Sequence, residues 1–394
     1  MQADRGSRVF YPELESLRGL AALAVSLCHV FNSAQRGAKD FGDFSFNDWS
    51  HFVLTSLLSS EGGVAIFFVL SGFVLSLQLG DEVTPMSWTK FAIRRIFRIM
   101  PACWASVVLA YLMLRVVHHQ HPDIEMIAQG LFLYQSFSVP INPPLWSLSV
   151  EMTISALLPM MVAANMRFAL VFQIVLVWIF YWASSLEGVP FFVPYFLAFQ
   201  LGIMIPAMGR IIDRLNTYLA AALFGIALVA VMSATNLNWQ GLILPKQQVQ
   251  IEVIGAFYVV AYVYRRKSLS LTAFLNWEPV RFLGRVSYSM YVLNYPLLGV
   301  LWTRWGLHQP FSLPHMMLAA TVFIPINIAS AYVSYRLFEV PFVRWGKSLS
   351  GHLPWSSVLP GDLPAAASAD RSAHRHARAV SSDWRSAPRG AALP

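Results

Sequence analysis

Long apolar segments separated by short polar segments dominate the pattern of this 394-residue chain. Most apolar segments approach the roughly 20 residues that a helix needs to cross a bilayer. Charged side chains gather between them, as in proteins whose helices lie in lipid. The pattern predicts an all-α fold, a polytopic transmembrane helical bundle of about ten spans, near 17–34, 62–79, 100–117, 147–164, 168–184, 190–208, 217–234, 250–264, 285–303 and 314–336.

Two segments depart from this pattern. Residues 125–138 are apolar but interrupted, and we expect an interfacial or re-entrant segment there. After Gly351 the chain becomes rich in Pro, Ala, Ser, Arg and His, a composition typical of disorder. The sequence therefore predicts an integral membrane domain over 1–350 and a disordered, basic cytoplasmic tail over 351–394.

Basic residues occur mainly in alternate loops. The loop 118–146 has no Lys or Arg, whereas Arg94, Arg95 and Arg98 precede the third span. Because cytoplasmic loops carry the excess of Lys and Arg, both termini are predicted to be cytoplasmic. The expected location of the protein is the cell inner (plasma) membrane. The polar N-terminal segment has no features of a cleavable signal peptide.

Composition narrows the class of protein further. The chain is 56% hydrophobic and 12% charged, about half the charge of a soluble domain. Topology accounts for the net charge of +8, so we expect no nucleic-acid partner. Cys28 and Cys103 lie in apolar spans, and the HHQH segment at 118–121 lacks further ligands at metal-binding spacing. No metal site is predicted.

Arg18 and His29 lie within one apolar segment. Their separation of eleven residues is close to three helical turns, which places both side chains on one helix face, about 16 Å apart along the axis. Ionisable groups inside a membrane are costly and therefore candidates for function. The alternative is an anchoring arginine and a histidine that bonds a neighbouring helix.

Glu151 is the carboxylate that we expect beside His29. It follows Trp146 by five residues in a span that starts at the outer side, which gives it a depth similar to that of His29. A carboxylate beside an imidazole fixes its tautomer and raises its basicity. Alternatively, Glu151 pairs with an arginine or faces water.

Arg95 and Arg98 lie one helical turn apart at the cytoplasmic entry to the third span and could bind phosphates together. Membrane anchoring by the positive-inside rule is the alternative, and it alone more often explains such a cluster. Asn142, Trp146 and Ser147 are expected at the outer surface, where an aromatic ring beside polar groups suits a sugar; Trp146 could also be an interfacial belt residue.

In the ninth span, Asn294 lies two residues before Pro296, near mid-membrane. A proline there frees a backbone carbonyl and can kink the helix. Near the end of the tenth span, Arg336 and Glu339 are expected to pair with each other at i,i+3. The glycines around 62–72 are expected to serve close helix packing.

Six segments in a fixed order resemble the membrane acyltransferase-3 family, whose members O-acylate sugars and other hydroxyl acceptors. They are LESLRGLAALAVSLCHVF, GGVAIFFVLSGFVLS, FAIRRIFRIMP, PPLWSLSVE, FLGRVSYSMYVLNYPLL and SYRLFEVPFVRWG, which together cover about 12–346. Any one of these segments is a weak signal, but the ordered set is specific. Many family members continue into an SGNH-type esterase domain, which we do not expect here.

The resemblance assigns residues to motifs. The family's arginine followed after ten residues by a histidine matches Arg18 and His29, and its WSLxxE segment ends at Glu151. Arg95 and Arg98 match the family's arginine pair at the start of the third helix. Where the family commonly has a histidine before the proline of the ninth span, this chain has Asn294.

The resemblance implies transfer of an acyl group, with acetyl the expected one, from acyl-CoA to a hydroxyl of a carbohydrate or glycolipid such as O-antigen or exopolysaccharide. No tightly bound cofactor is expected. The implied roles are His29 and Glu151 in catalysis, Arg18, Arg95 and Arg98 in binding CoA phosphates, and Asn142, Trp146, Ser147 and Asn294 in binding the acceptor. The alternatives are a small-molecule acceptor such as a macrolide, or a non-enzymatic transporter or flippase.

Overall fold

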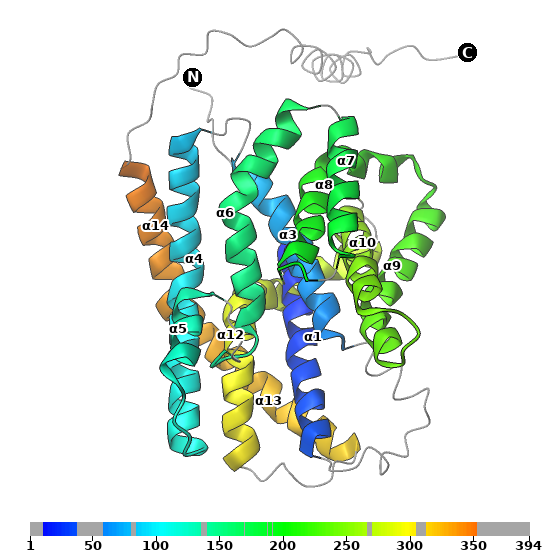
Figure 1. Ribbon diagram of the computed structural model, residues 1–394. Coiled ribbons are helices and arrows are strands. Elements are labelled where there is room, and N and C mark those ends of the chain that lie inside the picture. Colours follow the sequence, from blue (N-terminus) through cyan, green and yellow to red (C-terminus); the bar gives the residue numbers. More distant parts are fainter. Residues whose placement is uncertain are drawn as a thin grey trace, which may run out of the picture. The chain divides into compact units, whose positions relative to one another are not determined.

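The computed structural model describes residues 11–37, 58–79, 84–134, 140–168, 170–186, 188–190, 192–265, 270–304 and 313–352. Within these ranges every regular element is a helix and there is no strand, which confirms the all-α fold (Figure 1). The predicted tail lies outside the described residues from 353 onward. The main helices are α1 (Pro12–Gly37), α3 (Ser60–Leu79), α4 (Pro85–Leu112), α5 (Ile124–Phe132), α6 (Leu145–Arg167), α7 (Leu170–Ala183), α8 (Phe196–Arg214), α9 (Thr217–Trp239), α10 (Pro245–Arg265), α12 (Glu278–Arg304), α13 (Leu313–Ser334) and α14 (Val340–His352).

Short non-α or one-turn elements connect some of these helices. They are the π-helical turns η2 (Met113–Val117) and η5 (Tyr335–Glu339), the 3-10 turns η3 (Val193–Tyr195) and η4 (Phe274–Asn276), and α11 (Ser270–Ala273). Through η5, helices α13 and α14 form one nearly continuous helical segment. The π-helical turn matters for the site because it changes which side chains share a helix face.

Every predicted span coincides with a helix. Seven described segments are long and apolar enough to cross a membrane: Pro12–Phe31, Ser60–Leu79, Met86–Val117, Leu145–Arg167, Val193–Arg214, Thr217–Trp239 and Met317–Gly351. The other three predicted spans fall on α7, which has 14 residues, and on the more polar α10 and α12. The protein is therefore a multi-pass membrane helical bundle.

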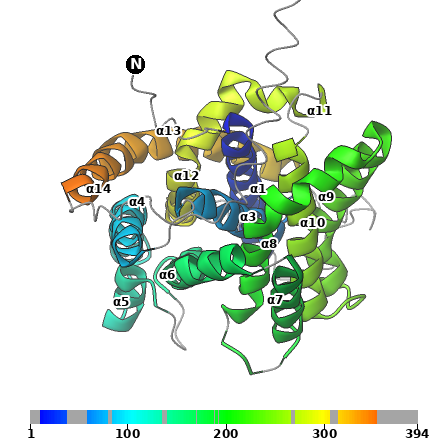
Figure 2. The same ribbon diagram turned by 90° about the horizontal axis from the view of Figure 1, so that it is seen from above.

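The interrupted segment near 125–138 forms α5, which packs along α4 (Figures 1 and 2). Cys103 donates a 3.4 Å hydrogen bond to the Gly130 carbonyl, and the Trp104 indole donates one of 2.9 Å to the Leu131 carbonyl. These two bonds attach α5 to α4, while Ile124 and Phe132 at the ends of α5 are exposed. The expectation of an interfacial or re-entrant segment stays a prediction.

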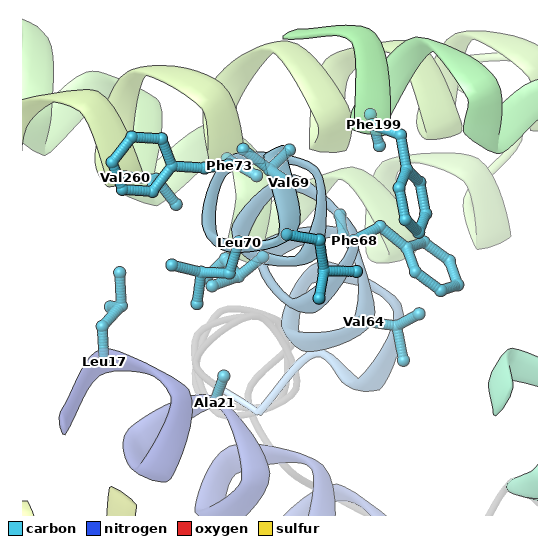
Figure 3. Close-up of a cluster of buried hydrophobic side chains, with 14 of the residues drawn as sticks. Leu17, Ala21, Val64, Phe68, Val69, Leu70, Phe73, Phe199 and Val260 are labelled. Atoms are coloured by element: carbon cyan, nitrogen blue, oxygen red, sulfur yellow. The ribbon is translucent and has the colours of Figure 1, made fainter. Parts of the chain in front are cut away.

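Helix α3 lies at the centre of the packing and contacts α1, α6, α8 and α10. Its side chains at Phe68, Val69 and Phe73 are almost fully buried, and Figure 3 shows them among residues of α1, α8 and α10. Glycines allow the close approach, since a Cβ on Gly72 would lie 2.3 Å from the Phe199 carbonyl oxygen. The expected packing role of this glycine-rich segment is confirmed.

Helices α1 and α12 approach each other as closely. A Cβ on Gly19 would lie 2.4 Å from the backbone nitrogen of Gly284, and a Cβ on Gly284 would lie 2.4 Å from the Glu15 carbonyl oxygen. Backbone therefore faces backbone at this contact, which sets the register between the two helices that carry Arg18 and Asn294.

Substituting Gly19 by Val is expected to separate α1 from α12 and to lower the free energy of unfolding by about 3 kcal/mol, the upper part of the usual range for overpacking. The neighbouring atoms are backbone and cannot rotate away. Gly225→Val on α9 is the matched control, because nothing lies within 4 Å of a Cβ there. Thermal unfolding in detergent measures both, and equal midpoints would contradict the described contact.

Candidate active site

Arg18 and His29 both contact α12, so the predicted common face of α1 is confirmed. The Arg18 guanidinium donates from Nε to the Ser287 hydroxyl at 2.9 Å and from Nη2 to the Gly284 carbonyl at 3.3 Å. The imidazole of His29 bonds through Nδ1 to the Asn294 side-chain oxygen at 2.8 Å. One pair of helices thus presents a cation at one level and an imidazole eleven residues further along α1.

The partner of His29 determines its tautomer. An amide oxygen can only accept, so Nδ1 donates in this contact, and in the neutral imidazole Nε2 then holds the lone pair. The ring of Tyr295 stands edge-on to the imidazole, with centroids 5.9 Å apart and an interplanar angle of 88°. His29 is half-buried and Asn294 is fully buried. The contact with Asn294 thus selects the neutral tautomer in which Nε2 is the proton acceptor.

Glu151 pairs with an arginine. It forms an ion pair with Arg95 and accepts a 2.7 Å hydrogen bond from the Ser71 hydroxyl. Arg95 also donates to the Ser155 hydroxyl, at 3.3 Å from Nε and 3.2 Å from Nη2. The predicted pairing of Glu151 with His29 is therefore corrected: Asn294 orients the imidazole, and Glu151 belongs to the arginine cluster.

The reason for this correction is where α6 begins. The prediction placed its first residues at the outer surface, but they lie inside the bundle, where Asn142 bonds the middle of α12. Glu151 is consequently level with the arginines, and its charge interacts with those of Arg95 and Arg18. Of the alternatives weighed for this carboxylate, pairing with an arginine is the one observed.

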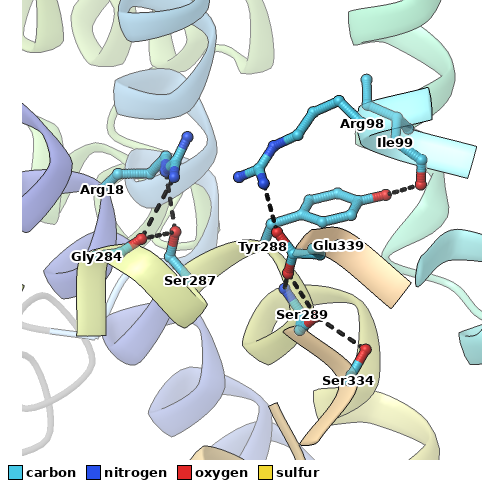
Figure 4. Close-up of polar contacts among 9 residues, drawn as sticks. All are labelled: Arg18, Arg98, Ile99, Gly284, Ser287, Tyr288, Ser289, Ser334 and Glu339. Carbon is cyan, nitrogen blue, oxygen red and sulfur yellow. Dashed lines mark hydrogen bonds and ion pairs between the residues drawn. The ribbon is translucent and has the colours of Figure 1, made fainter. Parts of the chain in front are cut away.

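Arg98 pairs with Glu339 across three helical segments (Figure 4). Its Nη1 lies 2.7 Å from Oε2 of Glu339, whose side chain is fully buried. The other carboxylate oxygen accepts from the Ser289 hydroxyl at 2.6 Å and from the Ser289 backbone N–H at 3.1 Å. The guanidinium also lies 5.8 Å from the centroid of the Tyr288 ring.

This pair replaces the predicted pairing of Arg336 with Glu339. The segment Tyr335–Glu339 is a π-helical turn, which closes i→i+5 bonds and has more residues per turn than an α-helix. Residues at i and i+3 therefore no longer share a face, and Glu339 turns toward α4 and α12.

Arg18 and Arg98 extend toward each other from α1 and α4 in Figure 4. The charge of Arg18 interacts with the like charge of Arg98 and with the opposite charges of Glu15, Glu339 and Glu151. A guanidinium has five N–H donors, so each arginine keeps donors beyond its protein contacts. Two guanidinium groups directed at one region favour binding of an anion there.

The predicted acceptor residues lie in the interior of the bundle. Asn142 is fully buried and donates to the Val292 carbonyl at 2.8 Å and to the Ser106 hydroxyl at 3.2 Å. Val292 lies four residues before Pro296, so its carbonyl is the one that this proline leaves without a backbone donor. Asn142 therefore completes the hydrogen bonding of a proline break, and the expected place at the outer surface is wrong.

Trp146 and Ser147 are also interior. Ser147 shares a 2.7 Å hydrogen bond with the Tyr291 hydroxyl, and Trp146 packs against Tyr195 and Phe68 with ring centroids 5.7 and 6.4 Å away. Ser147 thus lies in the core beside α12, and the half-buried Trp146 packs against η3 and α3. Neither contact tests whether an acceptor binds there, so that role stays a prediction.

Comparison with known proteins identifies the family of this chain. A family model described as "Acyltransferase domain" matches residues 11–336, most of the chain. The chain belongs to the membrane acyltransferase-3 family. Membership assigns enzyme activity to the bundle, and the transporter alternative has no support from these findings. The matched range includes each arginine and the imidazole described above.

A curated relative is the Peptidoglycan O-acetyltransferase OatA of Listeria monocytogenes serovar 1/2a, 22% identical over 395 residues. The match covers 87% of this chain but only 57% of the relative, so the chain spans little more than half of that protein's length. No solved structure matches.

Proposed function

We propose that this acyltransferase moves an acetyl group from acetyl-CoA to a hydroxyl of a carbohydrate or glycolipid acceptor, in the cell inner membrane. The observation that carries the proposal is the shared face of α1, where Arg18 joins a cluster of arginines and His29 is oriented by Asn294. The name of the relative, a peptidoglycan O-acetyltransferase, supports a carbohydrate acceptor.

The arginines provide the donor end of the site. Arg18 and Arg98 would bind the CoA phosphates through charge-assisted hydrogen bonds. Arg95 would bind them through those of its N–H groups that do not bond Glu151 or Ser155. An extended pantetheine arm can follow α1 over the roughly 16 Å to His29. The thioester then arrives beside the imidazole.

His29 provides the chemistry. Its Nε2 takes the proton from the acceptor hydroxyl while that oxygen bonds to the thioester carbonyl carbon. The tetrahedral intermediate then expels the CoA sulfur, which receives the proton from His29 and leaves as the free thiol. General-base assistance of this kind typically contributes 10²–10⁴-fold in rate.

The test is to incubate membranes that contain the protein with acetyl-CoA labelled in the acetyl group, and to follow both free thiol and the fraction that gains label. Thiol release with label in a glycan or glycolipid fraction supports the proposal. Label in a small-molecule fraction supports the alternative, an acyltransferase with a small-molecule acceptor, and contradicts a carbohydrate acceptor. No thiol release with acetyl-CoA or with longer acyl-CoA donors contradicts an acyl-CoA donor.

Removing the Arg98 charge is expected to weaken donor binding. The double substitution Arg98→Gln/Glu339→Gln avoids leaving a buried carboxylate without its cation, and should raise KM for acetyl-CoA by about 10- to 100-fold, the worth of a hydrogen bond to a charged group. Arg94→Gln is the matched control, since Arg94 bonds Ser350 of α14 instead. An unchanged KM in the double variant would place the donor elsewhere.

A further inference from the structure

Asn294 uses its amide in the opposite way to two other buried asparagines. Asn142 and Asn327 each direct Nδ2 to a backbone carbonyl and a serine hydroxyl, and leave only the amide oxygen without a partner among the described residues. Asn294 directs its oxygen to His29, and its Nδ2 is buried with no hydrogen-bond partner in that same part of the chain.

The difference has an energetic meaning. A carbonyl oxygen has two lone pairs and tolerates incomplete bonding, whereas an orphan buried N–H is rare. Leaving such a donor unpaired costs about 1–3 kcal/mol. Positioning of His29 requires only the amide oxygen, so positioning does not explain why the residue carries a buried donor beside the imidazole.

An acyl transfer supplies an acceptor for this donor. When the acceptor oxygen attacks the thioester, the carbonyl π-electron pair moves onto the carbonyl oxygen, which becomes an oxyanion close to the base. We propose that Nδ2 of Asn294 donates to this oxyanion, so that one amide orients His29 through its oxygen and stabilises the tetrahedral intermediate through its nitrogen. This inference rests on the proposed function.

The step is balanced without a further reactant. The hydroxyl proton moves to Nε2 of His29, the new ester oxygen–carbon bond forms, and the carbonyl oxygen carries the negative charge toward Nδ2. On collapse the carbonyl re-forms, the carbon–sulfur bond breaks, and the CoA thiolate takes the proton from His29. Donors aimed at the charge that develops in a transition state are commonly worth 10²–10³-fold in kcat.

Asn294→Asp separates orientation from oxyanion binding. Aspartate has nearly the same shape and keeps an oxygen for Nδ1–H of His29, but it has no N–H2. If Asn294 only positions the imidazole, the Asp variant keeps or gains activity, since a carboxylate orients histidine at least as well as an amide. If Nδ2 binds the oxyanion, kcat falls while KM for acetyl-CoA stays within about threefold.

We would measure thiol release from acetyl-CoA by wild type, Asn294→Asp, Asn294→Ala and Asn327→Ala, each normalised to folded protein from thermal unfolding in detergent. The expected result is a loss of at least 100-fold in kcat for both Asn294 variants, with Asn327→Ala less stable but unchanged in kcat per folded molecule. Asn294→Ala keeps the test open if the aspartate variant does not fold.

The outcomes separate this inference from the proposed function. Wild-type thiol release together with near-normal kcat in Asn294→Asp overturns the oxyanion role and leaves the acyltransferase proposal standing. A loss in Asn294→Asp that appears in KM rather than kcat also overturns it. Absence of thiol release by the folded wild type overturns both.

Discussion

His29→Ala is expected to lower acyl transfer by about 10²- to 10⁴-fold, because the general base is lost while the arginine cluster stays intact. The side chain contacts Asn294 and the edge of Tyr295, and Arg18, eleven residues earlier in α1, has separate partners in Ser287 and Gly284. Turnover should therefore fall without a comparable change in KM for acetyl-CoA. Thiol release at several donor concentrations measures both constants.

The matched control for His29 is His121→Ala, which removes an exposed imidazole that contacts Arg115. This variant should keep wild-type turnover. A folded His29→Ala protein that retains near-normal turnover would show that another group removes the hydroxyl proton.

Glu151→Gln is expected to act on stability and donor binding rather than on proton transfer. Breaking a buried ion pair by removing one partner costs about 3–5 kcal/mol, and we expect the lower end here because Arg95 and Glu151 keep 13% and 19% of their side-chain surface exposed. Glutamine can still accept from the Ser71 hydroxyl and Arg95, but without the charge. The unfolding midpoint should fall and KM for acetyl-CoA should change.

The pairing can be tested in the same experiment. If Arg95 is the functional partner, Arg95→Gln combined with Glu151→Gln should recover part of the stability lost in Glu151→Gln, because no unpaired charge remains. A fall in kcat at unchanged stability and KM in Glu151→Gln would instead restore the histidine–carboxylate dyad expected from the sequence.

The sequence predicted the fold and one face of the site. Arg18 and His29 belong to a single continuous helix, so their spacing alone fixes their common direction, and the contacts with α12 confirm it. The span pattern was equally direct, since the helices coincide with apolar segments whose length the bilayer sets.

The partners of these side chains could not be predicted, for identifiable reasons. Counting residues from the membrane surface misplaced Glu151, because the start of α6 lies inside the bundle, beside the middle of α12. The i,i+3 rule failed at Glu339, because Tyr335–Glu339 is a π-helical turn. Asn142 donates to the Val292 carbonyl, which Pro296 leaves without a backbone donor, although Asn142 and Val292 are 150 residues apart. No local sequence pattern indicates such a tertiary contact.

Binding of a non-hydrolysable acetyl-CoA analogue to wild type, His29→Ala and Arg98→Gln/Glu339→Gln, measured alongside turnover, distinguishes donor binding from proton transfer. We expect His29→Ala to bind the analogue within about threefold of wild type and to turn over about 10²- to 10⁴-fold more slowly, whereas the double variant binds about 10- to 100-fold more weakly. Loss of analogue binding in His29→Ala with normal binding in the double variant would contradict the separation of donor binding and proton transfer along α1.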